Sequence, residues 1–203
     1  PCIEWTDAAG QPHRLRWRSL AEVPPPRRVQ LADDTLSADA AYRLVCEGTA
    51  LLWQGDFHQA RQMLQALGRR VDKAAERAAQ RAPRATDITQ TFHLHRKAQA
   101  ERARILGLLL IPFEADHTIP LRRAPDVRQA CAEAHEAWQA PEPYAAALRE
   151  LQGVVGAHEW RKKGVPVPAL GASIHPHHGV FSPVRGEYLD LVRDAPLPAA
   201  LSA

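Results

Sequence analysis

Histidine side chains gather near the end of the chain, where three of them stand within four residues. His175, His177 and His178 could hold a zinc or nickel ion, because imidazole is a common ligand of both metals. Pro176 interrupts the local geometry, however, and no cysteine or carboxylate stands at ligand spacing. His177 and His178 are adjacent, so on a strand they would point to opposite faces. We therefore predict no metal site and interpret the segment as a polar turn between two strands, with a metal site as the alternative.

A second cluster combines a flat aromatic ring with three cations, at Trp160, Arg161, Lys162 and Lys163. Cations in the last turn of a helix complement the helix dipole, which explains them without any ligand. They could also contact a phosphate or an acidic substrate, with Trp160 available for stacking. The two interpretations are compatible, and the cluster is our candidate for substrate recognition together with His175, His177 and His178.

A further set of cations follows one predicted helix and its polar extension. The default interpretation of such a run is a solvated helix face, since Asp72 and Glu76 dilute the charge, and RNA contact is the alternative. The set comprises Arg61, Arg69, Arg70, Lys73, Arg77, Arg81 and Arg84.

Sequence motifs of known catalytic sites are missing from the chain. It has no G-x-G-x-x-G, P-loop, H-E-x-x-H or G-x-S-x-G pattern. It contains no asparagine and no Asp-Pro-Pro, so the Asn/Asp-Pro-Pro-Tyr/Phe box of amino-group methyltransferases is missing too. We therefore predict no catalytic residue within the chain.

The composition is that of a globular, alanine-rich chain. Of 203 residues, 45% are hydrophobic, 24% are charged and only 6% are aromatic, which argues against a large β-sandwich. The net charge of +3 is too small to indicate nucleic acid by itself. Three scattered cysteines suggest no disulfide framework, and no signal peptide or membrane-spanning run is visible. We expect a cytoplasmic protein with no membrane partner.

The elements that must position these residues are mostly helical. We predict a β-hairpin over residues 3–17, with its turn at Asp7–Gly10, and a stiff linker at Pro24–Pro26. Apolar residues at helical spacing predict five helices, of which the first two form a hairpin and the first has Ser37 as its N-cap. These helices span residues 37–52, 57–81, 92–110, 125–138 and 144–163, with a flexible connection over 82–91. Short strands are predicted over 173–182, followed by a helix from 187 to 192.

These elements predict a mainly α fold of the α+β class with three parts. Residues 1–31 are the hairpin and its Pro-rich linker, and residues 32–165 are a helical accessory domain. Residues 166–203 form a short β-hairpin and a helix that lead into a further domain.

Two stretches resemble a bacterial family of class I S-adenosylmethionine-dependent methyltransferases. Ala32–Phe57 is similar to the family's N-terminal helical region. His158–Val165 and Ile174–Val192 resemble its entry segment, a strand–Pro–helix element that precedes the first strand of a Rossmann-like domain. The family carries a small-methyltransferase domain related to the ribosomal-protein and release-factor glutamine methyltransferases. The sequence shows no D-x-G-x-G-x-G turn, so we expect an accessory front half that is inactive by itself.

The resemblance implies a cofactor and residues that lie beside it. Phe181, Ser182 and Pro183 match the position that packs beside the methionine end of S-adenosylmethionine, and Arg185 or Glu187 stands where a polar contact could follow. Val184 departs from the glutamine-methyltransferase pattern Pro-Arg-Pro-Glu-Thr, which puts a glutamine substrate in doubt.

The resemblance also implies an activity for the longer enzyme. It would methylate a protein or RNA substrate, with ribosomal substrates as one class, and the present chain would recognise that substrate. The alternative is a stand-alone helical module that binds protein or RNA without catalysis.

Overall fold

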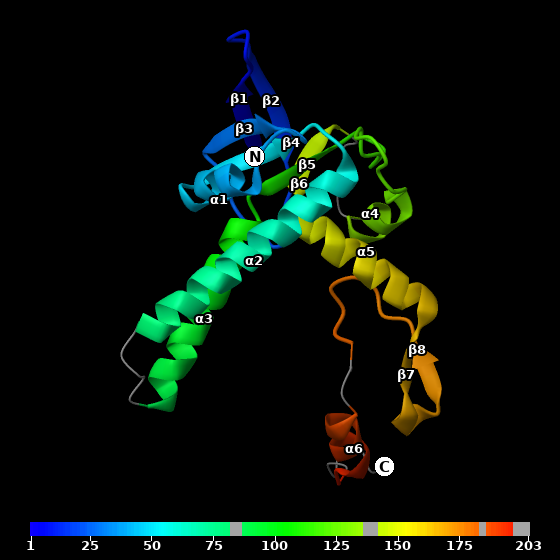
Figure 1. Cartoon of the computed structure of the whole chain (residues 1–203). Helices are drawn as coiled ribbons and strands as arrows, with labels where there is room; N and C mark the ends of the chain where they lie inside the picture. Colours follow the sequence, from blue (N-terminus) through cyan, green and yellow to red (C-terminus); the bar gives the residue numbers. More distant parts are fainter. Residues whose placement is uncertain (82–86, 136–141, 183–185, 197–203) are drawn as a thin grey trace.

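The computed structural model describes residues 1–81, 87–135, 142–182 and 186–196 (Figure 1). Within these residues, six strands form one mixed sheet in the order β1-β2-β6-β5-β4-β3. The strands are β1 (Cys2–Thr6), β2 (Pro12–Trp17), β3 (Arg28–Ala32), β4 (Thr49–Trp53), β5 (Leu109–Phe113) and β6 (Tyr144–Ala147). The helices are α1 (Ala38–Cys46), α2 (Phe57–Arg81), α3 (Ile88–Leu106), α4 (Arg128–Ala134), α5 (Leu148–Lys163) and α6 (Glu187–Asp194).

The strand directions decide which loops meet. β3, β4 and β5 are parallel neighbours, so their carboxyl ends lie along one edge of the sheet. β6 runs antiparallel to β5 and parallel to β2, and β1 and β2 form the predicted antiparallel hairpin. Tyr144 begins β6 opposite Phe113, the last residue of β5, and therefore lies on the same edge.

Both faces of the sheet are covered. Helices pack on one face, where Val45, Leu67 and Leu148 belong to the main apolar core. On the other face a second core joins Ile3 and Trp17 of the hairpin to residues of the central strands. The sheet is nearly barrel-shaped, and β1 contacts β3 from the far end of the strand order. The N-terminal hairpin is thus part of the same sheet as β3–β6.

The predicted mainly α fold, with residues 32–165 as a helical accessory domain, is wrong: the chain has an α/β fold built on this sheet. The first error concerns residues 49–53. Helix α1 begins after Ser37, whose side chain accepts a hydrogen bond from the Ala40 N–H as predicted, but it ends at Cys46. Gly48 has a φ of +84°, and the chain then turns into β4 instead of continuing as a helix.

Two further predicted helices contained strands. The helix predicted over 92–110 runs from Ile88 to Leu106, and β5 follows it. The helix predicted over 144–163 begins only at Leu148, because Tyr144–Ala147 is the buried strand β6. A short apolar run that is buried on both sides cannot be told from a helix segment by its periodicity.

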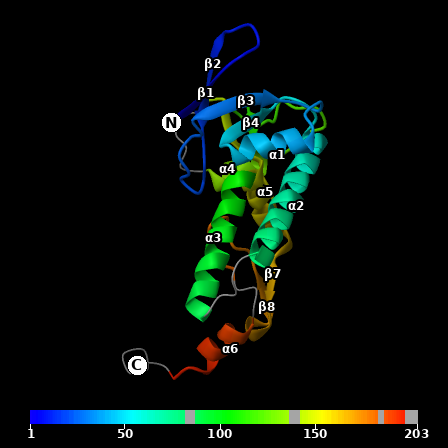
Figure 2. The same ribbon diagram turned by 60° about the vertical axis from the view of Figure 1, so that its left-hand side comes forward.

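Helices α2 and α3 lie side by side as an arm that projects from the sheet, as Figures 1 and 2 show. The helix predicted from Phe57 to Arg81 is confirmed. The predicted flexible connection over 82–91 is wrong for 88–91, which belong to α3, since Asp87 caps that helix by accepting a hydrogen bond from Gln90 N–H (2.7 Å). Residues 82–86 lie outside the described residues.

The chain after α5 differs from the prediction in where its strands lie. β7 (Val165–Val167) pairs with β8 (Ala172–Ile174) across a short turn at Pro168–Leu170. The predicted hairpin over 173–182 is wrong, because residues 175–182 carry no strand. The helix predicted from Glu187 is α6. Among the described residues, no helix is both long and apolar enough to cross a membrane.

Candidate functional site

Two acidic residues come two and three positions after the ends of parallel strands, at the carboxyl edge of the sheet. Asp34 follows β3, and Asp56 follows β4 and precedes α2. Arg122 and Arg123 belong to the segment after β5 and reach back to the same place. In open α/β sheets, ligands bind outside the carboxyl ends of the strands, so a ligand site is expected at this edge.

The four side chains form a network of charge-assisted hydrogen bonds. Arg123 Nε donates to Asp56 Oδ2 (2.6 Å), and Arg122 Nη2 donates to Asp34 Oδ2 (2.5 Å). Asp34 Oδ1 accepts the backbone N–H of Asp56 (2.8 Å), and Asp56 Oδ1 accepts that of His58 (2.8 Å). The Arg123 guanidinium, followed by the His58 backbone N–H, lowers the pKa of Asp56 to about 2. The network thus ties three strand ends together.

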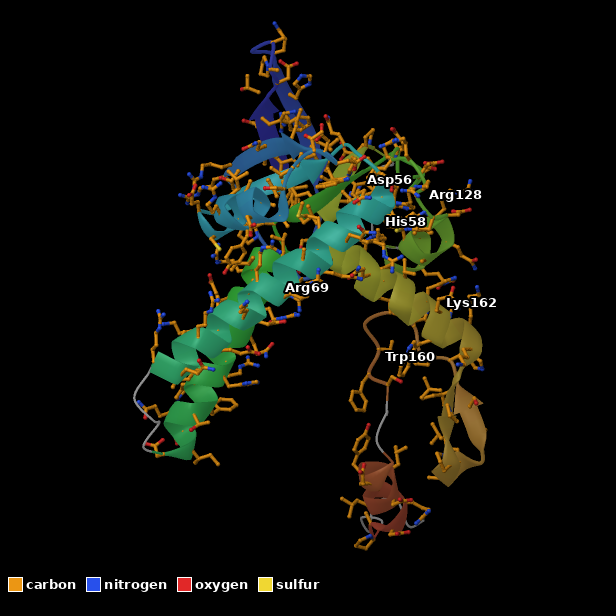
Figure 3. The ribbon with its side chains drawn as sticks, viewed as in Figure 1. Asp56, His58, Arg69, Arg128, Trp160 and Lys162 are labelled. Atoms are coloured by element: carbon orange, nitrogen blue, oxygen red, sulfur yellow. The ribbon has the colours of Figure 1, made fainter. Side chains whose placement is uncertain are left out.

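Geometry favours a structural role for this network over a catalytic one. Asp56 is only 3% exposed, and its carboxylate is already paired. Gly55 is so close to Asp34 that an added Cβ would lie 2.3 Å from Asp34 Oδ1. The hollow over the network measures about 420 Å³ and is lined by the two ion pairs and Gln59. Figure 3 shows Asp56 and His58 at the start of α2.

A second polar cluster lies on the same edge around Tyr144. His117 Nδ1 lies 3.0 Å from the Tyr144 hydroxyl. The guanidinium carbon of Arg18 lies 5.2 Å from the centre of the Tyr144 ring. Burial lowers the pKa of His135 to about 3, with further contributions from His117, Arg18 and His178. Burial and then Arg18 also lower the pKa of His117. Both imidazoles are therefore neutral at physiological pH.

The cluster also contains Cys131, which is 1% exposed and lies within hydrogen-bond reach of Tyr144. Burial raises the pKa of this thiol to about 11 and also raises that of Tyr144. A nucleophilic cysteine needs a lowered pKa, so this arrangement makes Cys131 inert.

We predict that iodoacetamide at about pH 8 modifies Cys46 and spares Cys131 in the folded protein. Cys46 is exposed, whereas only about one Cys131 in a thousand would be a thiolate at that pH. Peptide mass spectrometry after a timed reaction measures both rates, and the same reaction in urea is the control in which both cysteines react. Equal rates in the folded protein would contradict the buried placement of Cys131.

The structure partly neutralises the predicted basic cluster at the end of α5. Arg161 pairs with Glu133 (3.0 Å), which also contacts His158 (2.9 Å), and Lys162 pairs with Glu159 (3.3 Å). Lys163 makes no ion pair with a described residue, and Trp160 is 51% exposed. Figure 3 shows Trp160 and Lys162 on α5. Most of this charge is thus balanced within the fold.

The three predicted histidines have different surroundings. His175 Nδ1 lies 2.6 Å from the Arg161 carbonyl oxygen, so His175 packs against the end of α5 beside the basic cluster. His178 is close enough to His135 to lower its pKa, and His177 is exposed. Among the described residues, no group of three histidine, cysteine or carboxylate side chains could hold a metal ion.

The entry segment carries the residues predicted beside the cofactor. Phe181 is 75% exposed, and Glu187 is exposed at the start of α6. Ser182 Oγ is buried and has no hydrogen-bond partner within the described part of the chain. Pro183 and Arg185 lie outside the described residues.

The network at the carboxyl edge was not among the sites predicted from the sequence. Asp34 and Asp56 would have been candidates had β3 and β4 been recognised, because an acidic residue shortly after a parallel strand lies at the ligand-binding edge. Nothing in the sequence pairs Arg123 with Asp56, which stands 67 residues earlier.

A comparison with known proteins found no family model that matches the chain and no matching curated protein.

Proposed function

We propose that this chain is the substrate-recognising region of an S-adenosylmethionine-dependent methyltransferase that acts on a protein or RNA. The proposal rests on the resemblance of Ile174–Val192 to the entry segment of that enzyme class. The chain has no Gly-rich turn of the kind that holds the cofactor, so the proposal places the main cofactor site in a catalytic domain that follows α6.

The exposed surface of the entry segment is the observation that supports this proposal best. Leu191 and Val192 of α6 are each 73% exposed, and Phe181 before the helix is 75% exposed. An amphipathic helix is stabilised mainly by burial of its apolar face. α6 lies away from the sheet in Figure 1, and no buried residue lies within it.

The decisive experiment produces a longer protein that includes the reading frame beyond Ala203. It then measures methyl transfer by this longer protein. We expect radiolabel from S-adenosylmethionine to enter ribosomes, ribosomal protein or RNA. By calorimetry, residues 1–203 alone should bind the cofactor more weakly than about 100 μM, because contacts to its adenosine are missing. Micromolar binding to residues 1–203 would contradict the placement of the cofactor site.

The second candidate is a stand-alone binding module, which is favoured by the charge on the arm formed by α2 and α3. This candidate predicts that the protein binds a macromolecule. It also predicts that neither residues 1–203 nor a longer form of the protein transfers radiolabel to that macromolecule. The two candidates therefore differ in a single measurement, the transfer of label.

A further inference from the structure

Positive charge is concentrated on the arm formed by α2 and α3. Residues 57–81 and 88–106 contain 10 Lys and Arg and 3 Asp and Glu, a net charge of +7. The whole chain has a net charge of +3, so the remainder has a net charge of −4. The arm and the rest of the chain thus carry opposite net charge, and the small overall charge conceals this separation.

Four of the arm's cations form a row along α2. Arg69, Lys73, Arg77 and Arg81 stand four residues apart, so each lies one turn beyond the last on the same side of the helix. All four are exposed, and none makes an ion pair with a described residue. Like charges at this spacing destabilise a helix, so the row lowers the stability of the arm it decorates. We define this set as the α2 cation row.

Other arginines of the arm have acidic partners. Arg70 pairs with Asp39 of α1 (2.9 Å), and Arg102 of α3 pairs with Asp72 (2.8 Å). These pairs hold α2 against its neighbours. The acidic residue Asp72 is therefore turned toward α3 and does not neutralise the α2 cation row.

The row begins beside a hollow between the arm and α5. This hollow measures about 380 Å³. Arg69 and Arg149 contribute cations to its wall, and Gln65 and Gln152 contribute amides that can both donate and accept hydrogen bonds. The ion pair of Arg102 with Asp72 also lines it. Figure 3 shows Arg69 in the angle between α2 and α5. The α2 cation row thus begins at this polar hollow, because Arg69 belongs to both.

An exposed aromatic ring stands on α3 of the arm. Phe92 is 58% exposed, and the centre of its ring lies 5.9 Å from that of His93. More than half of the surface of this residue is open to solvent, so its ring is accessible to a ligand. Nucleic acid bases stack on exposed aromatic rings without regard to their identity.

We propose that the arm binds RNA that contains unpaired bases. The α2 cation row contacts successive phosphates, the hollow beside Arg69 accepts a nucleotide, and Phe92 stacks on an unpaired base. A line of cations about 6 Å apart follows a sugar-phosphate backbone. Exposed aromatic residues favour RNA over duplex DNA, since proteins read RNA mostly at loops and bulges whose bases are free to stack.

This inference deepens the proposed function and rests on it only for the role of RNA as the methyl acceptor. The test measures binding by residues 1–203 without cofactor. RNA binding without methyl transfer by the longer protein would overturn the proposed function and leave the inference standing. Methyl transfer by the longer protein without RNA binding would overturn the inference and leave the proposed function standing. The partner would then be a protein.

The test uses a fluorescent RNA stem–loop and a fully paired RNA duplex, titrated at several salt concentrations. The row variant replaces Arg69, Lys73, Arg77 and Arg81 with Gln. The control variant replaces Arg14, Arg27, Arg28 and Arg43 with Gln, which removes the same charge from exposed residues outside the arm that make no ion pair with a described residue. Circular dichroism checks that both variants keep their helices.

We expect the row variant to bind the stem–loop at least about 30-fold more weakly. The slope of the logarithm of the binding constant against the logarithm of the salt concentration should be smaller in magnitude by about 0.7 for each phosphate that the row no longer neutralises. The control variant should bind less than about 3-fold more weakly. Phe92→Ala should weaken binding of the stem–loop more than that of the duplex, by about 5-fold or more. Leu170→Ala, at an apolar side chain outside the arm that is 67% exposed, should not weaken it. Equal effects in the row and control variants, or no binding by the parent chain at low salt, would overturn the proposal.

Discussion

Replacement of Ile3 by alanine is expected to lower the free energy of unfolding by about 2–5 kcal/mol. Ile3 is 0% exposed and belongs to the second apolar core, where the N-terminal hairpin meets the central strands. Removing most of its side chain leaves a cavity between β1 and those strands, and a close-packed core cannot fill that cavity completely. Urea unfolding followed by tryptophan fluorescence measures the change.

The matched control is Ile88→Ala. Ile88 is 86% exposed at the start of α3, so the same substitution there should change the free energy of unfolding by no more than about 0.5 kcal/mol. If Ile3→Ala were as mild as Ile88→Ala, the hairpin would not close the second face of the sheet.

Replacement of Asp56 by asparagine should destabilise the protein most at neutral pH. The variant loses the hydrogen bond from Arg123 to a carboxylate that is 3% exposed and that joins the ends of β4 and β5. The pKa of Asp56 falls from an ordinary 3.8 to about 2 on folding, so ionised Asp56 stabilises the native state above about pH 4. That stability is lost as the pH falls from about 4 to about 2. The stability difference between parent and variant should therefore shrink over this window.

Asp126→Asn provides the comparison for this pH profile. Asp126 also has a pKa of about 2, because Arg128 donates to it, but the two residues are only two positions apart. The unfolded chain keeps such a local pair within reach, whereas Asp56 and Arg123 separate on unfolding. We expect Asp126→Asn to change stability little at any pH. A pH-independent effect of Asp56→Asn in urea titrations would mean that its carboxylate is not ionised and paired in the native state.

Local sequence patterns predicted several of the elements that have one face in water. The Ser37 cap identified the start of α1, and apolar residues at helical spacing identified α2 from Phe57 onward. Alternating residues on either side of the Asp7–Gly10 turn identified the β1–β2 hairpin. In each case the alternation of solvent-exposed and buried positions along the chain indicates the type of element.

The central strands could not be recognised in this way. All residues of Ala50–Trp53 and Tyr144–Ala147 are buried, because helices cover one face of the sheet and the hairpin covers the other. A strand without a solvent-exposed face shows no alternation of apolar and polar residues. The sequence pattern therefore favoured helices in both places. The buried strands β4 and β6 were therefore predicted as helix, whereas β3 alternates between exposed and at least partly buried positions and was not predicted as a strand either.

The sequence alone determines where the charges stand, including the four-residue spacing of Arg69, Lys73, Arg77 and Arg81. Only the tertiary structure decides which of them are neutralised: Arg161 meets Glu133, and Arg102 meets Asp72, whereas the α2 cation row meets no acidic side chain of the described residues. It also decides that Asp56 is buried against Arg123 at a shared strand edge. The physical reason is that helix periodicity is a local property, whereas ion pairing and burial depend on which distant segments the sheet brings together.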